Sequence, residues 1–149
     1  MAMSASNERV LFLCTGNTAR SQMAEAFLRK YAGRHLEAYS AGFMPSAINP
    51  YTERVMREIG IDLSGQYSKS VKEYLGKMSF TYLITVCAEA EANCPTTFPG
   101  ISHRLSWAFD DPAAVGRSEE EMLRKFREVR DQIEKRIKLW LEEKGISQE

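Results

Sequence analysis

The segment VLFLCTGNTARS, residues 10–21, joins an apolar strand to the start of a helix through a short loop of small and polar residues. Five such residues separate Cys14 from Arg20, which lets the loop fold back with its backbone N–H groups directed at one centre. A nest of amides at the N-terminus of a helix binds oxyanions, and an arginine there can donate two parallel hydrogen bonds to the anion. We therefore expect a tetrahedral anion directly over the sulfur of Cys14.

The same positive field predicts that Cys14 is a nucleophile. A free thiol has a pKa of about 8.5, and sites of this kind lower it to roughly 3.5–7.5. Asn17 is suited to a left-handed turn position, and the Ser21 hydroxyl can donate a hydrogen bond to the sulfur. The expected anion-binding residues are Thr15, Gly16, Asn17, Thr18, Ala19, Arg20 and Ser21. The alternative is a structural cysteine at a strand end, followed by an ordinary helix.

Length and composition indicate one globular domain. The chain has 149 residues, of which 44% are hydrophobic and 27% charged, and twenty basic residues balance twenty acidic ones. A net charge of zero gives no indication of a nucleic-acid or membrane partner. We expect a disordered tail at 1–7, a single domain at 8–149 and a cytoplasmic location, since the start lacks the features of a signal peptide. Three cysteines in such a protein favour catalytic or redox roles over structural ones.

The hydrophobic pattern predicts an α/β protein, a three-layer αβα sandwich with a four-stranded parallel sheet. We expect a loop over 88–99. The expected strands are 9–14, 36–41, 80–86 and 101–107, and the expected helices are 20–32, 49–60, 70–75 and 118–143. Asn49 before Pro50 and Ser118 three residues before Glu121 are helix-capping signals.

Cys87, Cys94 and Asp111 are the remaining candidates for chemistry. Cys87 follows the third strand at the ligand-bearing edge of an open α/β sheet, and Cys94 lies seven residues further on. Two structural cysteines, or half a zinc site, are the alternatives, but His103 is the only nearby imidazole and we expect no metal. Asp111, just before Pro112, is a candidate general acid at the mouth of the anion loop. The alternative is that Asp-Pro is only a turn signal.

Residues 14–25, CTGNTARSQMAE, resemble the active-site loop of the low-molecular-weight protein tyrosine phosphatase superfamily, in particular its thioredoxin-coupled arsenate reductase branch. The similarity extends from Arg9 to the end of the last helix. In that branch a second cysteine ends the third strand and a third lies seven positions on, which Cys87 and Cys94-Pro95 match. Members of the branch often carry a cysteine where this chain has Ala19. The tyrosine-rich segment that follows Asp-Pro in the tyrosine phosphatases is absent, which argues against phosphotyrosine peptides as the main substrate.

The resemblance implies reduction of arsenate to arsenite, with phosphate or sulfate as competing anions. Cys14 would attack arsenic while Asp111 protonates the departing oxygen, Cys87 would attack Cys14 and release arsenite, and Cys94 would attack Cys87. Thioredoxin would then reduce the exposed disulfide. No cofactor is implied beyond a potassium ion near Asn17, Glu25 and Ser40, and we expect a monomer. The alternatives are a phosphatase that hydrolyses phosphate monoesters through a Cys14 phosphocysteine, and a catalytically silent phosphate-binding module.

Overall fold

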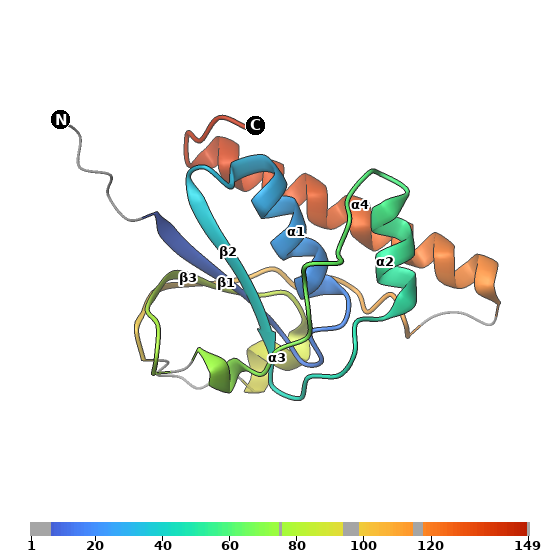
Figure 1. Ribbon diagram of the computed structural model, residues 1–149, viewed down its shortest axis with the longest axis horizontal. Coiled ribbons are helices and arrows are strands. Elements are labelled where there is room, and N and C mark those ends of the chain that lie inside the picture. The colour runs from blue at the N-terminus through green and yellow to red at the C-terminus, as the bar shows by residue number, and fades with distance from the viewer. Residues whose placement is uncertain (1–6, 75, 94–98, 115–117, 149) are drawn as a thin grey trace.

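The computed structural model describes residues 7–74, 76–93, 99–114 and 118–148, and in that part four parallel strands form one sheet (Figure 1). The strands are β1 (Glu8–Cys14), β2 (Leu36–Gly42), β3 (Phe80–Thr85) and β4 (Ile101–Ser106), in the order β2-β1-β3-β4. The central strand β1 pairs with β2 and with β3, and residues 10–14 are buried. A parallel strand covered on both faces needs a continuous apolar run, as the sequence indicated. The predicted sheet is confirmed, with strand ends shifted by one residue.

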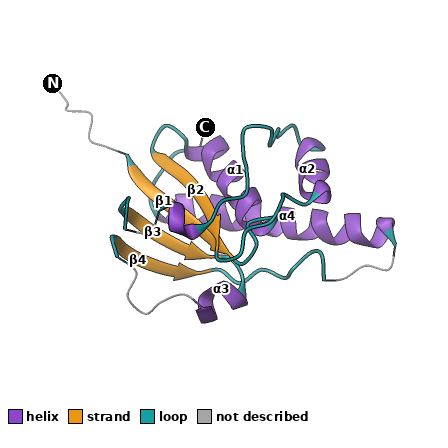
Figure 2. Ribbon diagram, turned by 60° about the horizontal axis from the view of Figure 1, so that its bottom comes forward, coloured by secondary structure: helices purple, strands orange, loops and turns teal. Residues whose placement is uncertain are grey.

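Helices cover one face of the sheet and shorter segments cover the other (Figure 2). Helices α1 (Arg20–Ala32) and α4 (Glu119–Glu143) pack against each other, and α2 (Pro50–Arg57) packs against α4. Alternate residues of β1 belong to different clusters: Val10 and Phe12 pack with the helices, whereas Leu11 and Leu13 pack on the opposite face with the 3₁₀ helix η1 (Val71–Glu73). This alternation is the period of two expected of a strand between two layers.

The predicted capping signals are present. Asn49 Oδ1 accepts a hydrogen bond of 2.8 Å from the Tyr51 N–H at the start of α2, and Ser118 Oγ accepts one of 3.2 Å from the Glu121 N–H at the start of α4. These side chains satisfy backbone donors that a helix leaves unpaired in its first turn. The capping signals therefore located both helix starts correctly.

The segment after Cys87 is a helix in its first part, which corrects the predicted loop over 88–99. Helix α3 (Ala88–Asn93) has the sequence AEAEAN, and alanine and glutamate are strong helix formers. The backbone N–H of Ala90 donates to Cys87 Sγ at 3.4 Å. The Cys94-Pro95 dipeptide that favoured a loop lies outside the described residues, as do residues 1–6 of the predicted tail. In the described part of the chain, every helix is too short or too polar to span a bilayer.

Candidate active site

Cys14 and Cys87 lie at the carboxyl ends of two adjacent strands. Leu13 is in register with Thr85, and the Val86 N–H donates to the Leu13 carbonyl at 3.0 Å. The two strands therefore stay paired up to the residue before Cys87. The sulfur atoms are 3.2 Å apart, and Cys14 and Cys87 are only 4% and 1% exposed. The sheet therefore holds two thiols in contact, although 73 residues separate them in the sequence.

The loop after Cys14 has its carbonyl groups tied to the surrounding chain. The bonds from neighbouring backbone N–H groups are Phe43 to Cys14 O at 3.3 Å, Met44 to Thr15 O at 2.8 Å, Ser46 to Gly16 O at 3.1 Å and Asn49 to Thr18 O at 3.1 Å. Within the described residues, the backbone N–H groups from Gly16 to Ser21 have no protein acceptor. These amides, with the N-terminus of α1, remain available for an anion, as the sequence predicted.

Asn17 holds the loop in shape from its centre. Its φ of 53° is in the left-handed region, which confirms the prediction for this turn. Its amide nitrogen donates to Ser21 Oγ at 2.7 Å and to Ser40 Oγ at 3.0 Å, and its Oδ1 accepts from the Lys69 N–H at 2.8 Å. Gln22 Nε2 donates to the Asn17 carbonyl at 3.1 Å. Ser21 Oγ thus accepts a hydrogen bond from Asn17, which leaves its O–H free to donate, and the Cys14 sulfur contacts Cys87. The expected bond from Ser21 to the Cys14 sulfur stays a prediction.

Gly42 allows this loop to approach β2 closely. A Cβ atom at Gly42 would lie 2.6 Å from the Thr15 carbonyl oxygen and 3.0 Å from the Asn17 nitrogen. Real Cβ atoms essentially never approach another atom within 3.0 Å. A glycine is thus required here for steric reasons, which its position at the end of a predicted strand did not reveal.

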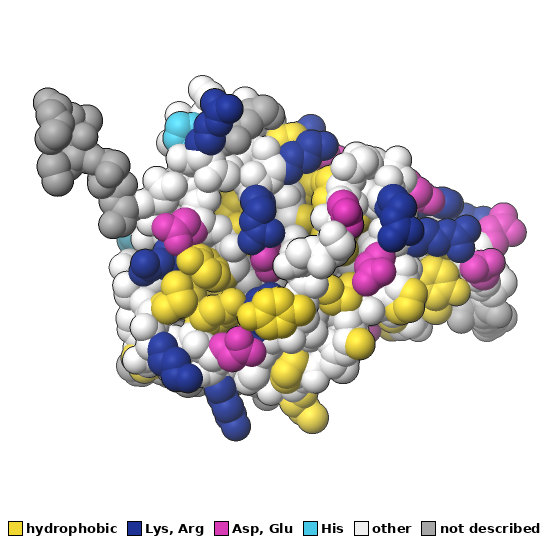
Figure 3. Space-filling view, in the orientation of Figure 1, with side chains coloured by type: hydrophobic (Ala, Val, Ile, Leu, Met, Phe, Trp, Pro, Cys, Tyr) yellow, Lys and Arg dark blue, Asp and Glu magenta, His cyan; other side chains and the backbone are white. Residues whose placement is uncertain are grey.

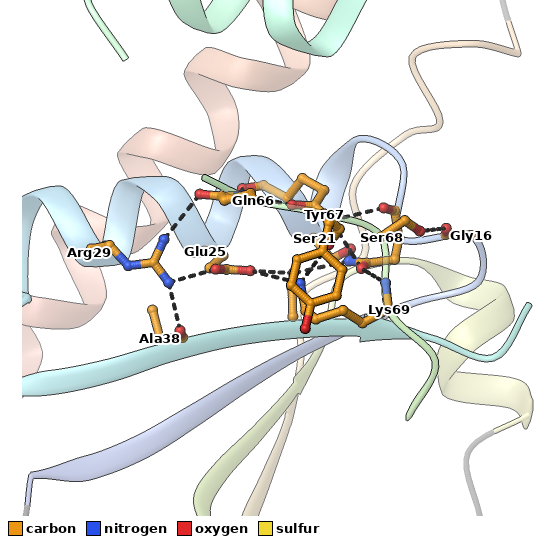
Figure 4. A network of polar contacts seen from close by, with 12 residues as sticks. Gly16, Ser21, Glu25, Arg29, Ala38, Gln66, Tyr67, Ser68 and Lys69 are labelled. Atoms are coloured by element: carbon orange, nitrogen blue, oxygen red, sulfur yellow. Dashed lines mark hydrogen bonds and ion pairs between the residues drawn. The ribbon is translucent and has the colours of Figure 1, made fainter. Parts of the chain in front are cut away.

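A polar cluster around Glu25 lies next to the loop (Figure 4). Glu25 Oε2 pairs with Arg29 Nη2 at 2.6 Å, and Glu25 Oε1 accepts from Ser40 Oγ at 2.5 Å and lies 3.7 Å from Lys69 Nζ. Lys69 is only 4% exposed; burial lowers the pKa of its ammonium group, and the Glu25 charge opposes that shift. Glu25 is therefore neutralised by two cations of the chain itself.

This cluster does not fit the predicted potassium ion. Asn17, Glu25 and Ser40 do lie together, but the Lys69 ammonium already supplies a positive charge beside Glu25. Asn17 directs its NH2 group toward Ser40, and a donor group cannot ligate a cation. Sequence reasoning missed Lys69, which lies in no recognisable motif, and Gln22, which lies within the quoted 14–25 motif but was given no role.

Arg20 connects the loop to the segment that follows β4. Its Nη1 donates to the Phe109 carbonyl at 3.0 Å. The Trp107 N–H donates to the Thr85 carbonyl at 2.7 Å and the Phe109 N–H to the Val86 carbonyl at 3.2 Å, so this segment passes the edge of the sheet where the thiols lie. The structure thus places Arg20 at the N-terminus of α1, as predicted, with its guanidinium beside the residues that lead into Asp111.

Asp111 is exposed, and its Oδ1 accepts a hydrogen bond of 2.9 Å from the Ala113 N–H. That bond closes the Asp-Pro turn that was the alternative to a general acid, so the Asp111 carboxyl group stabilises a turn in this structure. The neighbouring Asp110 pairs with Lys125 Nζ at 3.0 Å. Asp110 is thus held by a cation, whereas Asp111 is held by a backbone N–H two residues away and follows a segment that Arg20 contacts.

The two thiols titrate as a coupled pair. Cys14 donates its hydrogen to Cys87, and this hydrogen bond, together with burial, raises the pKa of Cys14 even though Arg20 acts to lower it. The same bond lowers the pKa of Cys87 to about 6 against the burial of that thiol, with help from the Ala90 N–H and the Thr15 hydroxyl. The prediction that Cys14 becomes the thiolate stays a prediction, because the hydrogen bond lets either sulfur of the pair carry the charge. Exchange of the charge requires only that the proton pass between two sulfur atoms 3.2 Å apart.

The remaining candidates contribute little to this picture. Cys94 lies outside the described residues. His35 and His103 are exposed, and His103 stacks on Tyr82. The described part of the chain has no group of three or more His, Cys, Asp or Glu side chains placed to hold a metal ion.

A strand that ends in a cysteine, an amide-lined loop and a helix N-terminus define a phosphatase-like anion site, and the chain belongs to the low molecular weight phosphotyrosine protein phosphatase family, which it matches over residues 9–149. Relatives that are 40–45% identical to this chain are named arsenate reductases. The arsenate reductase of Halalkalibacterium halodurans is 45% identical over 138 residues, which cover 91% of this chain and 97% of that protein.

Similar solved structures include arsenate reductases and a low molecular weight protein tyrosine phosphatase from T. tengcongensis, which has a TM-score of 0.72 at 25% identity and covers 92% of this chain and 99% of that one. An arsenate reductase in its phosphate-binding state superposes with a TM-score of 0.77 at 28% identity, covering 91% of this chain and 98% of that one. The thioredoxin-dependent arsenate reductase of Corynebacterium glutamicum has a TM-score of 0.66 at 29% identity, covering 93% of this chain and 62% of that one. The predicted fold and the predicted family are confirmed.

Proposed function

We propose that the protein reduces arsenate to arsenite, with Cys14 as the nucleophile and Cys87 as the second thiol. The observation that carries this proposal is the 3.2 Å separation of the two sulfur atoms. A phosphatase of this type needs one thiol and a water molecule, whereas a reductase needs two thiols that can form a disulfide. Relatives at 45% identity with the name arsenate reductase support the same activity.

The proton shared by the thiols gives the first step a simple path. Arsenate binds to the free N–H groups of residues 16–21 and to Arg20, which places arsenic over Cys14. Cys87 accepts the Cys14 proton across their hydrogen bond, and the Cys14 thiolate attacks arsenic. Asp111 is the candidate donor for the departing oxygen, after its turn at the rim opens toward the loop.

The second step transfers two electrons. The Cys87 sulfur attacks the Cys14 sulfur, the sulfur–arsenic bond breaks, and arsenite leaves with the electron pair while a Cys14–Cys87 disulfide forms. The overall change consumes arsenate and two thiols, and it yields arsenite, one disulfide and water. Both sulfur atoms are already in contact, so this step needs no large movement of either strand.

The disulfide then moves outward to Cys94. Helix α3 lies between Cys87 and Cys94, and an isolated helix of six residues is marginally stable in water, so it can unwind at low cost. Cys94 attacks Cys87, frees Cys14 and leaves a Cys87–Cys94 disulfide. Thioredoxin, at about −270 mV, is a suitable reductant, and the C. glutamicum relative depends on it.

The remaining partners follow from the site and from the balance of basic and acidic residues. Phosphate and sulfate should compete with arsenate, because both are tetrahedral oxyanions. A net charge of zero favours neither nucleic acid nor an anionic membrane as a partner. We propose a cytoplasmic monomer.

The test compares two cysteine variants in two assays. Cys87→Ser should abolish arsenate reduction coupled to thioredoxin while p-nitrophenyl phosphate hydrolysis continues, because hydrolysis needs only Cys14 and the anion loop. That loop makes phosphate monoester hydrolysis the second candidate function. Cys14→Ser should remove both activities. Continued arsenate reduction by Cys87→Ser would exclude the proposed relay, and any activity of Cys14→Ser would exclude the proposed nucleophile.

A further inference from the structure

The two buried thiols are arranged for oxidation even without arsenate. A disulfide bond is about 2.05 Å long, so the sulfur atoms of Cys14 and Cys87 have only about 1.2 Å to close from their separation of 3.2 Å. These are the free cysteines of the described chain, and Ala19 leaves Cys87 as the thiol that faces Cys14. An oxidant that reaches Cys14 therefore meets a second thiol already in place.

The anion loop offers hydrogen-bond donors to a small oxidant. The backbone N–H groups of residues 16–21 have no acceptor within the described part of the chain, and they belong to the loop that directly follows Cys14. Hydrogen peroxide is smaller than arsenate and accepts hydrogen bonds at both oxygens. The same amides can stabilise the hydroxide that leaves when the O–O bond breaks, just as they stabilise an oxyanion. Because Cys14 is 4% exposed and Cys87 1%, a bulky organic hydroperoxide has no comparable access.

We propose that Cys14 and Cys87 form a thiol pair that hydrogen peroxide oxidises directly, so that the protein is also a thioredoxin-linked peroxide reductase. The Cys14 thiolate, formed when Cys87 accepts its proton, attacks one peroxide oxygen. The O–O bond breaks, Cys14 becomes a sulfenic acid, and hydroxide leaves and takes up a proton. Cys87 then attacks the Cys14 sulfur and expels the second oxygen as water. Two thiols thus lose two electrons, one peroxide becomes two water molecules, and a Cys14–Cys87 disulfide remains.

The Cys14–Cys87 disulfide formed by peroxide is also the product of the proposed arsenate reaction. Its recycling through Cys94 and thioredoxin therefore rests on the proposed function. Oxidation of the pair itself does not, because it needs neither arsenate nor a reductant. The two proposals can therefore fail separately. A protein that forms the disulfide with peroxide but does not reduce arsenate would refute the proposed function alone.

The experiment uses the reduced full-length protein in the Cys94→Ser background, in which the disulfide cannot move outward. One equivalent of hydrogen peroxide should remove two thiols, and peptide mapping should find a Cys14–Cys87 disulfide. The rate should exceed that of glutathione at the same pH at least tenfold, phosphate should slow it, and cumene hydroperoxide should react at the glutathione rate. Cys14→Ser should lose the fast reaction, and Cys87→Ser should stop at a sulfenic acid or a more oxidised form of Cys14.

The wild-type protein then tests turnover. With thioredoxin, thioredoxin reductase and NADPH, peroxide should drive NADPH oxidation above the rate without the protein, and Cys87→Ser should not. Thiol loss at the glutathione rate, insensitivity to phosphate, or Cys14 oxidised beyond sulfenic acid without a disulfide would each overturn the proposal. A disulfide that forms but gives no turnover would refute the reductase activity.

Discussion

Gly42→Ala is predicted to displace the anion loop. The backbone of Gly42 belongs to strand β2, a conformation that alanine adopts freely, so the effect of the substitution is steric. The new Cβ would lie 2.6 Å from the Thr15 carbonyl oxygen, and because contacts under 3.0 Å essentially do not occur, the two must separate by at least 0.4 Å. Overpacking of this kind costs about 1–3 kcal/mol of stability. A misplacement of about 1 Å can cost 10²-fold in rate, so we expect kcat/KM for arsenate to fall roughly tenfold.

The assay pairs urea denaturation with steady-state arsenate reduction, and Gly65→Ala is the matched control. A Cβ atom at Gly65 meets nothing within 4 Å, so that variant should behave as the wild type in both measurements. Phosphate affinity should weaken for Gly42→Ala in parallel with kcat/KM, because both depend on the same amides. Wild-type stability together with wild-type kcat/KM in Gly42→Ala would refute the argument that close approach of Gly42 shapes the loop.

Three further predictions concern charge and the support of the loop. The ultraviolet absorbance of thiolate should rise as the pH passes about 6. The hydrogen bond from Cys14 lowers the pKa of Cys87 to about 6, so both thiols are protonated well below that pH. A first rise near pH 9 would contradict the effect of Cys14 on Cys87. Asn17→Ala should destabilise the protein by about 2–4 kcal/mol in urea denaturation, since it leaves the buried Lys69 N–H unpaired and places alanine at φ 53°. Asn17→Gly should lose less stability than Asn17→Ala. Equal losses would count against a contribution from the φ of 53° at this position. Replacing KCl with NaCl should leave kcat/KM for arsenate unchanged, because Lys69 supplies the cation beside Glu25; a potassium-dependent rate would contradict this.

Local sequence signals predicted the scaffold well. The apolar run before Cys14 could form only a strand covered on both faces, and it is the central strand of the sheet. Asn49 and Ser118 marked helix starts through hydrogen bonds that span two or three residues, so the evidence for them was local. Asn17 was placed in the left-handed region for the same reason, because its short side chain suits that turn.

Features that depend on contacts between distant segments were not predictable. The charge of the thiol pair depends on the separation of Cys14 and Cys87. The pairing of β1 with β3 sets that separation, so neither strand alone predicts it. Lys69 follows a connection with no clear pattern, yet its ammonium group lies beside Glu25. Helix α3 was missed for a different reason: its alanines and glutamates favoured a helix, but the proline after Cys94 drew the prediction toward a loop.

The two sulfur atoms owe their separation to strand pairing rather than to any loop. Backbone hydrogen bonds between β1 and β3 continue to Val86, one residue before Cys87, so the redox pair lies at the end of two hydrogen-bonded strands. Segment 43–48, whose N–H groups hold the carbonyl groups of the anion loop, lies outside this strand pairing. Its sequence can therefore change the loop without changing the distance over which electrons pass, and for protein engineering it is the natural place to begin.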